Sequence, residues 1–275
     1  MVNKSTEVSI ITSYFNSGIY VKDSMDKIFQ FCDFYYKKKF EIIFVNDGST
    51  DNTFIELKKL AKLKKPFYSN CLIKIIDMKK NFGQAGAYIT GMLQSTGRRI
   101  IILEGDFVKE QEINLINFYK KYLTLEKKGT DLLILDKIFI SRSIVDTVLS
   151  FLFWKVYLFT SGIKLKQNIC WTRIFDRKIL NEIIKYDTLE FNANKIFLNK
   201  SKSFKVLNVK KKFKGYSNYT FFKKLKLATT LIFYSFIRLR KININFQKKK
   251  IHEKNSKFGE NLITNGIQIN CIFLA

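Results

Sequence analysis

The sequence is poor in the residues that build disulfide frameworks and zinc sites. It has one histidine, one proline and four cysteines, and Cys32, Cys71, Cys170 and Cys271 form no CxxC pair. This spacing excludes the usual zinc and disulfide patterns, so reduced thiols in a cytosolic compartment are expected. The first residues lack the apolar stretch of a signal peptide. No uninterrupted apolar run reaches the roughly 18 residues of a transmembrane helix. A cytosolic protein is predicted.

Acidic residues are also scarce, because 23 Asp and Glu stand beside 49 Lys and Arg, which gives a net charge of +26. Residues 195–257 alone hold 19 basic residues and one acid. Such a charge attracts nucleic acid, anionic lipid or phosphorylated substrates. A solvated basic surface in a lysine-rich proteome is the alternative. The 27 Phe, 13 Tyr and 47% hydrophobic residues exclude a disordered chain and indicate a real core.

The first half of the chain alternates segments typical of strands and of helices. Strands are expected at residues 7–14, 41–45, 72–77 and 99–103. Helices are expected between them, at residues 20–34, 52–63 and 83–95. Repeated β-α-β units with short connections predict an α/β fold with a mostly parallel sheet covered by helices on both faces.

Three polar clusters follow predicted strands, at residues 14–16, 46–49 and 104–106. Ligands of such sheets bind beyond the carboxyl ends of the strands, so these clusters are expected to meet at one edge. Asp47 can accept hydrogen bonds from a nucleobase or ribose, or it can simply form an Asx-turn and cap a helix. Glu104 and Asp106 can hold Mg²⁺ or Mn²⁺ that bridges to a diphosphate, although acidic pairs at strand ends are common.

The segment NFGQAGA at residues 81–87 indicates a helix start crowded with small residues. Small residues permit close approach to the sheet or to a ligand, and a helix amino end favours phosphate. Simple close packing explains the same pattern equally well.

Taken in order, these segments resemble the family 2 glycosyltransferases, which have the GT-A fold. The resemblance is closest to the branch of dolichol-phosphate mannose synthases and bacterial polyprenyl-phosphate glycosyltransferases. It runs from about residue 7 to residue 236. The segments that carry it are VNDGSTD (45–51), NFGQ (81–84), the acids Glu104 and Asp106, RIFDRK (173–178) and GYSNY (215–219).

The resemblance implies roles for particular residues. The residues expected to bind the nucleotide are Tyr14 or Phe15, Asp47, Asn81, Gly83 and Glu104. Glu104 and Asp106 are expected to bind the metal, and the implied cofactor is a divalent cation, Mg²⁺ or Mn²⁺. Catalytic roles fall to Asp106, Arg142 and Arg173. The acceptor phosphate falls to Lys137, Arg142, Arg173, Arg177 and Lys212. Arg173 and Arg177 would share one face if they lay on a helix, but not on a strand or loop.

The sequence departs from the family pattern at several positions. The usual Pro and Glu of the first motif are Ser13 and Ser17, and the acidic motif opens with Glu104 instead of Asp. The Gln that often follows the second acid is Val108, while Glu112 does stand where the family usually has an acid. A weaker metal site, a changed donor preference or a lost activity would each fit these changes.

The C-terminal half suggests contact with a membrane. Residues 144–160 and 221–239 are apolar and helical in pattern but interrupted by charges, which favours helices lying in an anionic membrane interface over buried core helices. The domain organisation expected is a GT-A domain at 1–215, an amphipathic interface region at 216–240 and a basic polar tail at 241–275. Relatives often carry two C-terminal transmembrane helices. None is expected in this chain, which is therefore expected to dock peripherally on the inner face of the cell membrane.

The function expected from the resemblance is inverting transfer of a sugar from a nucleotide sugar to a polyprenyl phosphate. A phosphate acceptor is already anionic and needs no general base, which suits a chain with one histidine, His252, in its basic tail. One rival is transfer to a saccharide hydroxyl, with Glu110, Glu112 or Asp136 as the base. The other is a non-catalytic membrane- or nucleic-acid-binding relative. No nucleic-acid module of known pattern is present, so no nucleic-acid partner is expected.

Overall fold

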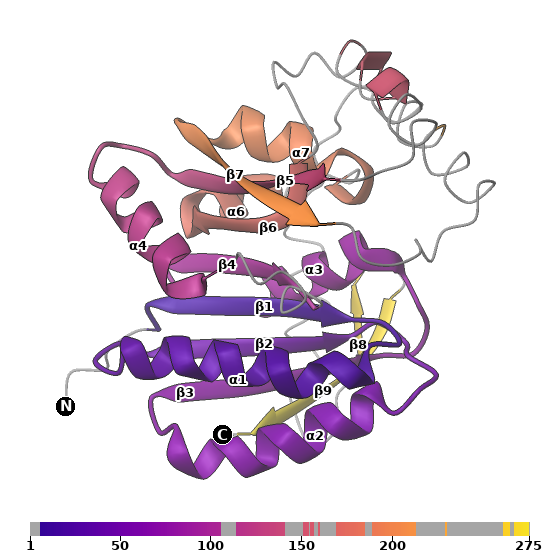
Figure 1. Ribbon diagram of the computed structural model, residues 1–275. Helices are drawn as coiled ribbons and strands as arrows, with labels where there is room; N and C mark the ends of the chain where they lie inside the picture. Colours follow the sequence, from indigo (N-terminus) through magenta and orange to yellow (C-terminus); the bar gives the residue numbers. More distant parts are fainter. Residues whose placement is uncertain are drawn as a thin grey trace.

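The computed structural model describes residues 6–105, 114–140, 151–153, 155–156, 159, 169–184, 189–212, 229, 261–264 and 267–274. Over these residues the chain forms a nine-stranded sheet with helices against it (Figure 1). The elements occur in the order β1 (Val8–Tyr14), α1 (Gly18–Phe34), β2 (Phe40–Asn46), α2 (Thr53–Lys64), η1 (Lys65–Phe67), β3 (Cys71–Met78), α3 (Gly83–Leu93), β4 (Arg99–Glu104), α4 (Leu115–Glu126), β5 (Leu132–Ile140), β6 (Ile169–Asp176), α6 (Arg177–Ile183), α7 (Leu189–Lys200), β7 (Phe204–Lys212), β8 (Asn261–Thr264) and β9 (Ile267–Leu274).

The strand order is β7-β5-β6-β4-β1-β2-β3-β9-β8. Strands β3, β2, β1 and β4 are parallel neighbours. Strands β5 and β7 run the same way, because β6 is antiparallel to both β4 and β5, and β7 is parallel to β5. The carboxyl ends of these six strands therefore share one edge of the sheet, called the carboxyl edge, and their amino ends share the opposite amino edge. The expected α/β fold, with a largely parallel sheet between helices, is confirmed.

The central strands are apolar along both faces, as strands buried between two helix layers must be. Every residue of β2 is buried. Its alternate side chains enter two separate cores: Ile42 and Phe44 pack with residues of α1, α2 and α4, whereas Ile43 and Val45 pack with residues of α3, α6 and α7. The helices on the two faces fix the layers that position the loops at the carboxyl edge.

The end of the chain differs from the expected polar tail. Residues 261–264 and 267–274 form the antiparallel pair β8–β9, and β9 extends the sheet beside β3 (Figure 1). The pairing sets Ile269 opposite Met78 and Leu274 opposite Ile73. The apolar residues of 267–274 are typical of a strand, a pattern that the prediction of one polar tail over residues 241–275 did not separate from the lysine-rich segment before it.

The two segments expected as interfacial helices fall mostly outside the described residues. Positions 151–153, 155–156, 159 and 229 within them are helical. Among the described residues, no helix combines the length and the apolar composition needed to cross a bilayer.

Candidate active site

The loops after β1 and β2 are bound to each other at the carboxyl edge. Asn16 has a positive φ of 47°. Its backbone N–H donates to Ser49 Oγ at 3.0 Å, and its side-chain Oδ1 accepts from Thr50 N at 2.8 Å. Ser17 N donates to Thr53 Oγ1 at 2.9 Å. Each loop therefore supplies donors to the other, and the hydrogen bonds join the two loops at the carboxyl edge.

The loop after β2 also presses on the loop after β3. Gly48 has a φ of +63°, and a Cβ added there would lie 2.3 Å from the backbone carbon of Lys80. Glycine is therefore required both for the left-handed backbone and for the close crossing. Asp47 is 3% exposed, and its Oδ1 accepts from Phe82 N at 2.8 Å, at the N-cap of α3. This oxygen of Asp47 therefore has a structural role, because it holds the backbone of the residue just before α3.

The acidic motif begins where β4 ends. Gly105 passes so close to β1 that an added Cβ would meet Ser13 O at 2.2 Å. Glu104 is half-buried, and its Oε1 accepts from Trp171 N at 3.3 Å. Strand β1 separates β2 from β4, so the backbones bearing Asp47 and Glu104 stand two strand spacings, roughly 10 Å, apart. Asp106 lies outside the described residues.

The two aromatic candidates at the end of β1 have different environments. Tyr14 is 1% exposed and lies in the core, where its hydroxyl is hydrogen-bonded to Ser24 Oγ at 2.5 Å. Burial raises the pKa of Tyr14 to about 12. Phe15 is 46% exposed beyond the strand end. Of the two residues expected to contact the nucleotide, Tyr14 or Phe15, the first is corrected, because its side chain is buried and bonded to Ser24 of α1, and Phe15 is the aromatic that a ligand can reach.

The start of α3 stands at the same edge. Asn81 Oδ1 accepts from Gly83 N at 2.8 Å, and Gly83 has a φ of +83° with open space where a Cβ would stand. Asn81 is exposed. The two residues expected to bind the nucleotide are therefore beside the loop that Asp47 holds.

The expected phosphate-binding residues do not gather in one place. Arg173 is fully buried in β6, whereas Arg177 begins α6, so the two do not share a helix face. Arg177 donates from Nε to Gly97 O at 2.6 Å and from Nη2 to Ser95 Oγ at 3.0 Å, which places it at the amino edge. An acceptor role for Arg177 is corrected to a structural one, because the sheet separates it from the acidic motif.

The remaining basic candidates are two lysines on strands of the sheet and one arginine outside the described residues. Lys137 lies in β5 and Lys212 ends β7, on strands whose carboxyl ends face the same edge as Glu104. Arg142, Glu110 and Glu112 lie outside the described residues. Asp136, considered as a base for a hydroxyl acceptor, is 2% exposed.

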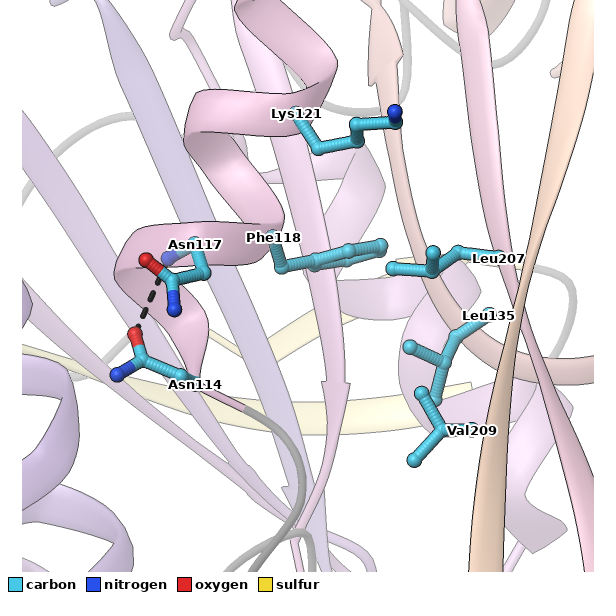
Figure 2. Close-up of a pocket in the computed structure, with 7 residues that line it drawn as sticks. All are labelled: Asn114, Asn117, Phe118, Lys121, Leu135, Leu207 and Val209. Atoms are coloured by element: carbon cyan, nitrogen blue, oxygen red, sulfur yellow. Dashed lines mark hydrogen bonds between the residues drawn. The ribbon is translucent and has the colours of Figure 1, made fainter.

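A separate cavity of about 300 Å³ lies between α4 and the strands β5 and β7. In Figure 2 the ring of Phe118 extends from α4 toward Leu207 and Leu135, and Asn114 and Asn117 stand at the start of the helix. Its lining is completed by Lys121 and Val209. The cavity lies beside α4, on the opposite face of the sheet from α3, and none of its lining residues belongs to the loops described above.

A family model described as glycosyl transferase family 2 matches residues 9–184, more than half of the chain. The chain belongs to this family. CsbB of Bacillus subtilis (strain 168), named among glycosyltransferases, is 28% identical over 182 residues, which are 65% of this chain and 50% of that protein. The dodecaprenyl-phosphate galacturonate synthase of Rhizobium johnstonii is 24% identical over 186 residues, 66% of this chain and 51% of that protein. The chain thus spans about half the length of these curated relatives.

One solved structure that resembles the chain is that of S. aureus TarS 1-349 in complex with UDP-GlcNAc. Its TM-score is 0.53 at 16% sequence identity, over 84% of this chain and 66% of that one. At this identity the likeness shows the fold, which agrees with the sheet and helix layers described above.

The described residues fit a divalent cation that is also bound by phosphate oxygens. Glu104 offers hard carboxylate oxygens at the carboxyl edge, and one or two carboxylates suffice when phosphate oxygens complete the coordination. Among the described residues, which omit Asp106, no group of three or more His, Cys, Asp or Glu side chains could hold a metal. The donor set at Glu104 therefore fits a cation shared with a bound diphosphate better than an all-protein cage.

Two residues at this edge were not singled out from the sequence. Asp77 Oδ1 accepts from Asn46 Nδ2 at 2.7 Å at the ends of β3 and β2, and Trp171 holds Glu104 through its backbone. Asp77 follows the apolar run of its strand, the same signal that identified Glu104, and this signal could have found it. Trp171 acts through its amide group, so no side-chain motif reveals it.

Proposed function

We propose that the chain is an inverting glycosyltransferase that moves a sugar from a nucleotide sugar to a polyprenyl phosphate at the cytoplasmic face of a membrane. The main support for a nucleotide-sugar donor is that three loops are joined at the carboxyl edge. Asn16, Gly48 and Asp47 tie these loops to one another, beside the carboxylate of Glu104. A preformed edge of this kind suits a nucleotide diphosphate, because binding then costs little loop ordering.

The donor roles proposed follow from exposure. Phe15 is open to stack on a base, and Asn81 with the first turn of α3 is open to the phosphates. Asp47 keeps the loop before α3 in place and acts on the donor through that loop. Glu104 and Asp106 would hold the divalent cation, which supplies positive charge to the leaving diphosphate when bound.

A polyprenyl phosphate acceptor is supported by the Rhizobium johnstonii relative, whose name includes dodecaprenyl phosphate. The chemistry is a single displacement. A phosphate oxygen of the acceptor bonds to the anomeric carbon while the bond from that carbon to the diphosphate breaks, and the nucleoside diphosphate leaves with the electron pair. The acceptor is anionic before it reacts, so the chain needs no base, and positioning with charge stabilisation supplies the catalysis. The anomeric configuration inverts.

Contact with a membrane is supported by exposed apolar side chains on the connection between β5 and β6. Phe151 is 57% exposed, Val156 is 45% exposed and Phe159 is 87% exposed, all at helical positions. The connection leaves β5 and returns to β6 at the carboxyl edge, where the acidic motif ends β4. A buried core helix would not expose these side chains, whereas a helix lying in the interface presents them to lipid.

The first experiment is a thermal-shift panel of UDP and GDP sugars with Mn²⁺, because a ligand that binds the folded state raises the melting temperature. The donor that shifts the parent is then incubated with undecaprenyl phosphate or with oligosaccharide acceptors, and the products are identified by mass spectrometry. We expect a glycosylated lipid phosphate from the parent, and loss of turnover in Asp106→Asn with an unchanged melting temperature.

Other outcomes assign the chain differently. Product with an oligosaccharide alone would replace the lipid phosphate with a saccharide hydroxyl as acceptor, a reaction for which the buried Asp136 is poorly placed as the base. Absence of any donor shift and of donor hydrolysis, with vesicle binding retained, would make the chain a non-catalytic membrane-binding relative.

A further inference from the structure

Arg173 lies deep in the β6 face that contacts α7, and its guanidinium is enclosed on all sides. It stands 5.0 Å from the ring centroid of Trp171 and 4.6 Å from that of Phe197. Its Nη2 donates to Cys170 O and to Asn194 Oδ1, both at 2.9 Å, and its Nε donates to Trp171 O at 3.1 Å. With no exposed surface, this group cannot meet an acceptor phosphate at the carboxyl edge.

The burial is costly for Arg173, since its hydrogen bonds go to carbonyl and amide oxygens. Burial lowers the pKa of Arg173 to about 10, and the negative charge of Glu104 opposes that shift. Its Nη1 has no hydrogen-bond partner among the described residues. A buried cation with an unsatisfied donor destabilises a fold relative to an apolar side chain of similar size. Stability alone therefore does not explain an arginine at this position.

The contacts of Arg173 lead to the acidic motif through one residue. Arg173 pairs with Ile102 in the antiparallel register of β6 and β4, so Trp171 comes level with Glu104 two residues further on. The carbonyl of Trp171 accepts from Arg173, and its N–H donates to Glu104 Oε1 at 3.3 Å. The indole ring also packs on Tyr88, at 5.1 Å between ring centroids. The peptide groups of Trp171 thus connect the buried cation to the carboxylate.

We propose that Arg173 is a positioning residue that holds Glu104 in its working orientation through Trp171. This inference rests on the proposed function for the role of Glu104, but the structural link can be tested without turnover. It replaces direct contact between Arg173 and the acceptor phosphate. Second-layer residues of this kind orient a metal-binding carboxylate without touching the metal or the substrate.

The test uses the fluorescence of Trp171. The chain has two tryptophans, so Trp154→Phe leaves Trp171 as the remaining one. In this background the emission of four proteins is compared: the parent, Glu104→Gln, Arg173→Met and the double variant. We expect Glu104→Gln to shift the emission of the parent. The same change should shift it less once Arg173 is gone, because the peptide groups of Trp171 are no longer held beside the carboxylate.

The kinetic arm repeats this cycle with the nucleotide-sugar transfer assay. Arg173→Met should lower kcat by about 10- to 100-fold, the usual cost of losing a second-layer partner. The loss should disappear in the Glu104→Gln background. Arg177→Met is the matched control, because it removes another guanidinium, one that is partly buried and lies at the amino edge. It should lower the melting temperature while kcat and the Trp171 emission stay as in the parent.

Equal emission shifts from Glu104→Gln in both backgrounds would overturn the positioning role. Additive losses of kcat in the double variant would overturn it as well. If Arg173→Met does not fold, Arg173→Lys runs the same cycle, since lysine keeps the charge but cannot contact two carbonyl oxygens and an amide in the same geometry. If the parent protein has no transferase activity, the proposed function is contradicted. The fluorescence measurements alone then test whether Arg173 and Glu104 are connected through Trp171.

Discussion

The two edges of the sheet differ in how far their charged residues are paired within the fold. At the amino edge Glu41 is completely buried, and it accepts hydrogen bonds from Ser9, Lys74 and Thr96. At the carboxyl edge Arg173 is just as buried but keeps one donor without a partner among the described residues, and Glu104 is half open. One edge satisfies its charges within the fold, whereas the other leaves polar groups and exposed side chains at a surface.

The difference teaches where stability and binding reside in this chain. The amino-edge network joins β1, β2 and β3 to residues 94–97, before β4, so it contributes to folding whether or not a ligand is present. The carboxyl edge gains its shape from tight glycines, Gly48 and Gly105, and from hydrogen bonds between loops. Changes at the amino edge should therefore alter unfolding, and changes at the carboxyl edge should alter ligand binding.

The largest effect is expected from Glu41→Gln. This change leaves the buried ammonium of Lys74 without its counter-charge, and removal of one partner from a buried ion pair costs about 3–5 kcal/mol of unfolding free energy. Urea denaturation followed by circular dichroism measures it. Glu7→Gln is the control, because the Glu7–Lys38 pair is partly exposed and is worth less than about 1 kcal/mol.

The pH dependence of stability provides a second measurement on the same variant. Burial alone would raise the pKa of Glu41, but the hydrogen bonds and charge of Lys74 and the bonds from Ser9 and Thr96 lower it below the usual value. The stabilisation is therefore present above the ordinary glutamate pKa of about 4.3 and is lost as the pH falls below it. Glu41→Gln should flatten this acid loss of stability. An unchanged acid profile would contradict the account of the amino edge.

A smaller loss of stability, with a loss of donor binding, is expected from Gly48→Ala. The left-handed backbone at Gly48 costs about 1–3 kcal/mol for a residue with a Cβ, and the added carbon would also press on Lys80. Gly129→Ala is the matched control, since Gly129 has a φ of +87° but open space around its Cβ position. We expect both variants to unfold more easily, and only Gly48→Ala to lose the thermal shift caused by nucleotide sugars. Retention of that shift would show that the loop crossing does not shape the donor site.

The sequence was sufficient to predict the sheet and its edge, but not the contacts made there. Apolar runs followed by VNDGSTD and by Glu104 located the ends of β2 and β4, because a buried parallel strand and its polar terminus are both local patterns. The burial of Tyr14 and the place of Arg177 at the amino edge were not predicted, because both depend on packing between elements: Tyr14 bonds to Ser24 of α1, and Arg177 bonds to Gly97, 80 residues away in the chain. The β9 strand was missed because its pairing with β3 joins distant segments.

The smallest effect is expected from the double change Phe151→Glu and Phe159→Glu, measured by flotation with vesicles of anionic lipid. Both side chains are exposed on the connection that leaves and re-enters the sheet at the carboxyl edge. Each aromatic ring that enters the lipid interface stabilises the bound state by about 1 kcal/mol or more. Replacing both rings should therefore weaken vesicle binding by at least about tenfold. Phe67→Glu is the control, because Phe67 is 82% exposed at the end of η1, on the amino edge. If the double variant and the Phe67→Glu control weaken vesicle binding equally, the membrane does not bind preferentially at the carboxyl edge, and the net charge of +26 accounts for the binding.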